Sequence, residues 1–239
     1  MQNTTKMGLN HTGAQMSPLD SEEQLKASRE VPPDIPGSTK KLALARAEMA
    51  AEADAIGSVP IPGTAKGMLK TALNKLMGVS PEMLIDKLGE RLAFERTGVR
   101  LYEALLAKAG VLAPMDAEIL NKLQHFRDEE AEHLDLVIAA MQRLGADPTA
   151  MTPCADIAGV TGMGVLQVIS DPRTNMTQSL NALLTAELTD NAGWELLIEL
   201  AEASNQPEIA ASFQKALAQE QDHLTTVRNW LSKAVLEQV

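Results

Sequence analysis

The chain has 239 residues, of which 45% are hydrophobic and 3% aromatic, so it can bury a sizeable core. Its formal net charge of −11 argues against nucleic acid as a partner, because phosphate contacts need clustered Lys and Arg. The single cysteine, Cys154, excludes a disulfide within the chain and a Cys-x-x-Cys metal site.

Residues 1–38 are polar and contain Pro32, Pro33 and Pro36, which predicts a disordered or extended tail. The tail lacks the apolar run of a secretory signal, and no stretch of the chain reaches the roughly 18 apolar residues of a membrane span. We therefore expect a cytoplasmic protein that does not bind membranes. Residues 39–79 predict a short helical extension, with helices over 40–55 and 65–77.

Residues 80–239 predict the main domain, built on four long helices. The first begins at Pro81, after a capping serine and before an acidic residue, and Gly110 marks its end. The four predicted helices cover residues 81–109, 115–144, 175–203 and 207–236. Short connections inside each pair predict two helical hairpins.

The connection between the hairpins, residues 145–173, carries glycines and prolines that we expect to break any long helix. A short helical or extended piece is expected at 165–169. A connection of this length can run along the whole bundle. The predicted fold is therefore all-α, a four-helix bundle with one long crossover and an N-terminal extension.

A Glu-x-x-His pattern occurs once in each hairpin, and residues three apart share one face of a helix. Each pattern follows an earlier glutamate at nearly the same spacing along the chain, and these earlier glutamates lie among apolar neighbours. A carboxylate on a core-facing stripe is costly unless it is paired or binds a metal. The alternative is that these glutamates lie on a solvated face. The predicted metal ligands are Glu95, Glu130, His133, Glu187, Glu220 and His223.

The charge of this ligand set indicates how many ions it holds. Four glutamates carry four negative charges, which two divalent cations would neutralise. The mixture of nitrogen and oxygen ligands suits iron or manganese rather than a zinc site rich in cysteine. We therefore expect two Fe ions, with Mn as the alternative.

Three further residues lie on the predicted ligand faces. Tyr102 lies two turns after Glu95, so its hydroxyl could donate to a ligand carboxylate or to any other buried acceptor. Asp190 follows Glu187 by three residues. Gly98 holds the equivalent place after Glu95, where it either leaves room for O₂ or peroxide or lets two helices pack closely.

In ligand type, order and spacing, residues 81–236 resemble the ferritin-like superfamily, and within it the rubrerythrin and bacterioferritin branch. The resemblance implies that Glu95 and His133 hold one metal, that Glu187 and His223 hold the other, and that Glu130 and Glu220 bridge them. It also implies an additional ligand at Asp190. The chain lacks the Cys-rich electron-transfer domain of many rubrerythrins, so an external electron donor would be needed unless the metal itself is the substrate.

The resemblance implies oxidation of Fe²⁺, or reduction of O₂ or H₂O₂, at a dinuclear site in a homodimer or larger homo-oligomer. Iron storage without turnover and oxygenation of an organic substrate are the alternatives. A bundle that has lost its metal and acts as an interaction module is a third, which the intact ligand set disfavours.

Overall fold

The computed structural model describes residues 7–10, 12–35, 37–62, 67–68, 81–112 and 117–238. These residues form helices and no strand, which confirms the predicted all-α class. They divide into two compact units, one ending at Ala55 and the other beginning at Ile56.

The N-terminal unit contains a short 3-10 helix, Ala14–Met16, and the helices α1 (Pro18–Glu30) and α2 (Thr39–Glu52). Helix α1 lies where the composition predicted a disordered or extended tail, and none of its residues is buried. The Ser38 hydroxyl caps α2 by accepting a hydrogen bond from the Lys41 amide. Most of the predicted helix at 65–77 falls outside the described residues, so the division of the chain at 38 and 79 stays a prediction.

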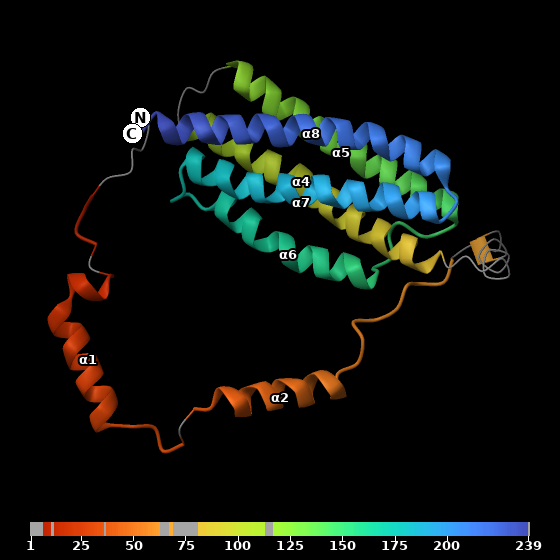
Figure 1. Ribbon diagram of the computed structural model, residues 1–239. Helices are drawn as coiled ribbons and strands as arrows, with labels where there is room; N and C mark the ends of the chain where they lie inside the picture. The colour runs from red at the N-terminus through yellow and green to blue at the C-terminus, as the bar shows by residue number, and fades with distance from the viewer. Residues whose placement is uncertain are drawn as a thin grey trace. The chain divides into compact units, whose positions relative to one another are not determined.

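Four long helices form the second unit, and Figure 1 shows them running alongside one another. They are α4 (Glu82–Leu112), α5 (Ala117–Leu144), α7 (Met176–Ala203) and α8 (Pro207–Leu236). Helix α4 packs against α5 and α7, and α8 packs against the same two helices. This closed cycle of neighbours is a four-helix bundle, as predicted.

Most helix ends of the bundle follow from local chemistry. Asn175 and Gln178 form a capping box at the start of α7, and Pro207 occupies the first turn of α8. Helix α5 ends before Gly145, whose φ of +83° favours glycine. The predicted end of α4 at 109 is wrong, because the helix continues through Gly110 to Leu112. A single helical glycine costs only about 1 kcal/mol relative to alanine, which α4 tolerates.

The crossover contains a helix of 18 residues, α6 (Pro153–Ser170), so the prediction of only a short piece at 165–169 is wrong. Its proline and glycines do not break it. Pro153 lies in the first turn, where no amide donor is needed, and Thr152 caps that turn by accepting from the Ala155 amide. A Cβ at Gly162 would lie 3.1 Å from Thr97 Cγ2, so this glycine lets α6 pack closely on α4.

Helix α6 also packs against α7. In length and composition alone it could cross a membrane, and among the described residues it is the one helix of which this is true. The absence of membrane binding and the cytoplasmic location stay predictions.

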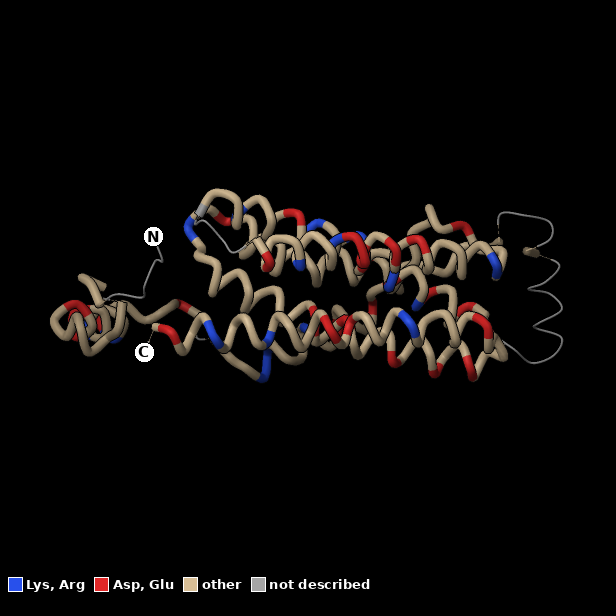
Figure 2. The backbone as a smooth tube through the Cα atoms, turned by 90° about the horizontal axis from the view of Figure 1, so that it is seen from above, with Lys and Arg blue, Asp and Glu red and all other residues tan. Residues whose placement is uncertain are grey.

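Two apolar clusters fill the bundle, one on each side of its middle. On α4, Leu92 belongs to the first cluster and Leu101 to the second, with Glu95 between them. On α5 the order is reversed, from Phe126 in the second cluster to Val137 in the first, as expected for an antiparallel neighbour. The bundle therefore brings polar residues of four helices to one buried level. Figure 2 shows the other acidic and basic positions interspersed along the helices.

Candidate metal centre

The six predicted ligands all lie buried at this middle level, on the four long helices. Glu95 comes from α4, Glu187 from α7, and the two Glu-x-x-His patterns from α5 and α8. The exposed fraction of each residue is 2% or less. The alternative that Glu95 and Glu187 face solvent is therefore wrong.

Three overlapping groups, drawn from five of these side chains and Asp190, could each hold an ion, with ligand atoms within 4.8 Å of one another. Glu220 belongs to all three groups, as a bridging carboxylate would. Glu187 belongs to none of these three groups, which are the ones found among the described residues. The groups are Glu95, His133 and Glu220; Glu130, Glu220 and His223; and Glu95, Glu130, Asp190 and Glu220.

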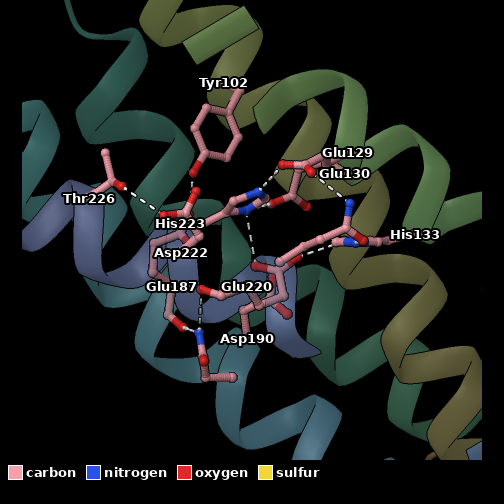
Figure 3. Close-up of polar contacts among 12 residues, drawn as sticks. Tyr102, Glu129, Glu130, His133, Glu187, Asp190, Glu220, Asp222, His223 and Thr226 are labelled. Carbon is pink, nitrogen blue, oxygen red and sulfur yellow. Dashed lines mark hydrogen bonds and ion pairs between the residues drawn. The ribbon is translucent and has the colours of Figure 1, made fainter. Parts of the chain in front are cut away.

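Both histidines turn Nδ1 toward the carboxylates (Figure 3). His133 Nδ1 lies 2.6 Å from Glu220 Oε1 and 3.8 Å from Glu95 Oε2. His223 Nδ1 lies 3.2 Å from Glu220 Oε2 and 3.6 Å from Glu130 Oε1. Glu220 therefore lies between the two imidazoles, with one oxygen near each.

Crowding of charge in a dry core shifts the protonation of this cluster. Burial, followed by the negative charge of Glu220, raises the pKa of Glu187 to about 8 and that of Glu130 well above its usual range. Burial alone would also raise the pKa of Glu220, but the two histidines hold it at about 2. Burial lowers the pKa of both histidines, but the contact with Glu220 at His133, and those with Glu129, Glu130 and Glu220 at His223, outweigh it and raise the pKa of each.

The side chains fit a metal centre, because many of their buried polar atoms make no hydrogen bond within the described part of the chain. Arg91 is an ion-pair partner of Glu95 Oε1 and Asp190 Oδ1, and most of the others face only carboxylates and imidazoles of the same cluster, so a metal ion would satisfy several at once. These atoms are both carboxylate oxygens of Glu95 and Glu220, Glu130 Oε2, Glu187 Oε2, Asp190 Oδ1, and Nδ1 of His133 and His223.

Two residues that the sequence analysis did not single out fix the outer nitrogens of the histidines. Glu129 Oε2 lies 2.9 Å from His223 Nε2, and Gln219 Oε1 lies 3.2 Å from His133 Nε2. The Gln219 amide also donates to Glu129 Oε1 at 2.6 Å, which joins the two contacts. Each residue directly precedes the glutamate of its own Glu-x-x-His pattern and contacts the histidine of the other hairpin. This cross-contact leaves Nδ1 of both rings for the cluster.

Tyr102 donates a hydrogen bond of 2.7 Å to Glu187 Oε1, and both residues are fully or almost fully buried (Figure 3). The tyrosine ring also meets the His223 ring edge-on, with centroids 6.0 Å apart. The sequence left open whether the Tyr102 hydroxyl donates to a ligand carboxylate or to another buried acceptor, and in the structure it donates to a predicted ligand carboxylate. Its equivalent in the second hairpin, Trp194, is buried at 5.6 Å from the His133 ring.

A buried arginine, Arg91, is the second feature that the sequence analysis missed. Its Nε lies 2.7 Å from Glu95 Oε1, and its Nη1 lies 2.9 Å from Asp190 Oδ1. Its positive charge offsets the extra negative charge of Asp190, so the four glutamates still match two divalent ions. A Cβ at Gly193 would lie 2.5 Å from Nη1, so the guanidinium packs where no larger side chain of α7 fits.

The space beside Gly98 is occupied, which corrects the hypothesis that it admits O₂ or peroxide. A Cβ at this position would lie 2.1 Å from Glu130 Oε2 and 2.8 Å from its Cδ. Gly98 therefore makes room for a ligand carboxylate from the neighbouring helix.

A model of the ferritin-like domain matches residues 85–236, which span all four bundle helices and every residue of the cluster. The chain belongs to the ferritin-like family. Comparisons with curated proteins and with solved structures gave no match.

Membership of the ferritin-like family and the buried histidine–carboxylate cluster are together compatible with a metal-binding protein.

Proposed function

We propose that this ferritin-like protein is a non-haem di-iron carboxylate oxidoreductase, which oxidises Fe²⁺ or reduces H₂O₂ or O₂ at a dinuclear centre. Di-manganese is the alternative occupancy. The observation that carries the proposal is the placement of Glu220 between two imidazoles whose outer nitrogens are already engaged. Such an arrangement leaves the inner nitrogens with no partner in the described residues other than carboxylates or a bound cation.

Under this proposal, Glu95 and His133 would hold one ion, and Glu130 and His223 would lie closest to the other. Glu220 would bridge them, with one oxygen near each histidine. Glu187 lies outside the three close groups, so it would complete the second ion's ligands after a small side-chain movement. Asp190, which Arg91 engages, would be the extra ligand.

The bound ions would supply the redox chemistry: oxidation of two Fe²⁺ releases two electrons, which with two protons convert H₂O₂ to two waters. The protein residues orient and shield this centre. Glu129 and Gln219 fix the imidazole rings, and Tyr102 fixes one oxygen of Glu187. The two apolar clusters of the bundle lie on either side of the histidine–carboxylate site and keep bulk water out of it. Further turnover would take electrons from an external donor.

The test is anaerobic loading of the purified chain with Fe²⁺, followed by addition of O₂ or H₂O₂ while near-ultraviolet absorbance is recorded. We expect absorbance to rise faster than with free Fe²⁺ in wild type with at least one oxidant, and no faster than with free Fe²⁺ in the double variant His133→Ala/His223→Ala. The faster oxidant separates Fe²⁺ oxidation by O₂ from peroxide reduction. A rate equal to that of free Fe²⁺ in the same buffer would refute the proposal.

A further inference from the structure

A cavity of about 310 Å³ lies between α4, α6 and α7, on the flank of the bundle that the crossover helix covers. This volume is at the lower end of the range for small-molecule sites. Its walls include Arg91 and Phe94 from α4, Ala158 and Val165 from α6, and Gly193 and Leu196 from α7. At the rim, Ile157 and Leu196 are 49% and 48% exposed, so solvent reaches the cavity between α6 and α7.

The polar side chains in the wall are mostly engaged with the protein itself. Lys87 Nζ pairs with Glu90 Oε2 at 2.5 Å. Four threonine hydroxyls donate to backbone carbonyls of their own helices, which leaves little hydrogen-bonding capacity for a ligand. These are Thr97 to Ala93, Thr161 to Ile157, Thr185 to Asn181 and Thr189 to Thr185.

Arg91 is the exception in this wall. The residue is 4% exposed, Glu95 and Asp190 occupy its Nε and Nη1, and its buried Nη2 has no hydrogen-bond partner among the described residues. The Phe94 ring, also in the wall, lies 4.2 Å from the guanidinium carbon. A ligand acceptor at Arg91 would satisfy this buried donor.

The charge around the cavity selects against an anionic ligand. Lys87 and Arg91 are the cations, and they face three carboxylates, those of Glu90, Glu95 and Asp190. Both cations are therefore already paired with carboxylates, so a buried carboxylate or phosphate would lose its hydration without an unpaired cation to offset that cost. A neutral acceptor, such as a carbonyl or ether oxygen, avoids this cost.

We propose that this cavity binds a small, neutral, mainly apolar molecule with one hydrogen-bond acceptor, to which the Arg91 guanidinium donates. The site goes beyond the proposed redox function and does not depend on it. Because Arg91 also contacts Glu95, the occupant would lie one side chain away from the metal ligands.

Three naphthalenes of similar shape test the acceptor requirement: 2-acetylnaphthalene, 2-ethylnaphthalene and 2-naphthoate. Isothermal titration calorimetry on the full, metal-free chain should give one ketone per chain. We expect 2-ethylnaphthalene to bind at least about tenfold more weakly, the value of one hydrogen bond to a charged group. We expect no measurable binding of 2-naphthoate. Absence of saturable ketone binding, or tighter binding of 2-naphthoate, would overturn the proposal.

Variants then locate the site. Ala158→Leu fills the cavity from α6 and should weaken ketone binding at least about tenfold. Ala211→Leu makes the same change at an exposed position of α8 outside the cavity and should bind as wild type. If circular dichroism shows that Ala158→Leu does not fold, Leu196→Trp at the exposed rim repeats the test from α7. Wild-type affinity in the folded cavity variant would refute the site.

Using the metal-free chain keeps this test separate from the proposed function. Ketone binding is expected whether or not the chain takes up iron. A chain that binds the ketone but no metal would therefore refute the redox proposal alone, and a chain that oxidises Fe²⁺ but does not bind the ketone would refute only the cavity proposal.

Discussion

The Glu130 carboxylate lies in the space that a side chain at Gly98 would need, with Oε2 at 2.1 Å from the position of the missing Cβ. Because the carboxylate is the end of a flexible side chain, an added methyl group would move it without unfolding the bundle. We expect Gly98→Ala to keep its helical circular dichroism but to bind Fe²⁺ at least about tenfold more weakly.

Gly110 supplies the control for this variant, since it lies on the same helix with nothing within 4 Å of its Cβ position. Gly110→Ala should gain up to about 1 kcal/mol of stability from helix propensity and keep its iron affinity. Equal iron affinities of the two variants would contradict the assignment of Glu130 as a ligand.

The hydrogen bond between Tyr102 and Glu187 should be measurable as a coupling energy. Tyr102→Phe removes the donor and Glu187→Gln alters the acceptor, so a double-mutant cycle isolates their interaction. We expect a coupling of about 1–3 kcal/mol in the free energy of urea unfolding of the metal-free chain. Additive effects of the two substitutions would show that the hydroxyl does not stabilise the carboxylate.

Glu129 should control metal affinity without binding a metal. Glu129→Ala frees His223 Nε2 and breaks the link to Gln219, so we expect iron affinity to fall about 10- to 100-fold with unchanged stoichiometry. Glu132 lies exposed on the same helix, and Glu132→Ala is the matched control. Equilibrium titration under anaerobic conditions measures both, and equal affinities would exclude Glu129 from the site.

Stability of the metal-free chain should fall as pH rises from about 5 to 8. The pKa of Glu187 is raised from 4.5 to about 8 by burial and the charge of Glu220. Its stabilising effect is therefore full below 4.5 and lost as pH rises toward 8. The pKa of His223 is raised above 6.5, so its effect is lost above that pH as well. Glu129 and Glu220, with pKa values of about 2, stay ionised throughout this range.

Thermal unfolding by circular dichroism at several pH values measures this trend. Glu187→Gln should flatten it, because the amide does not titrate. A midpoint that rises with pH in the wild-type chain would show that the acidic groups of the cluster are not protonated in the folded state.

The sequence was most informative where one residue type repeats at helical spacing. The two Glu-x-x-His patterns and the glutamates before them indicated four helices. They also predicted that six side chains of these helices converge at one level of the bundle. Helix α6 was missed because its glycines and Pro153 were treated as breakers, although a proline after the Thr152 cap begins a helix. The carboxylate that fills the space beside Gly98 comes from a neighbouring helix, and spacing along one helix cannot predict such a contact.

Arg91, Glu129 and Gln219 were missed for a different reason: charged and amide residues on helices usually face solvent. Signals for them do exist in the sequence. Arg91 lies four residues before Glu95, on the same face, where an ion pair can form. Glu129 and Gln219 hold equivalent places before Glu130 and Glu220, so the internal repeat itself pairs them.

The most direct test of the dinuclear centre is the amount of iron bound per chain, measured by elemental analysis after anaerobic loading and removal of free metal. The six converging side chains predict two ions per wild-type chain, and fewer in His133→Ala/His223→Ala. A wild-type chain that retains no iron, or a double variant that retains two ions, would contradict the account.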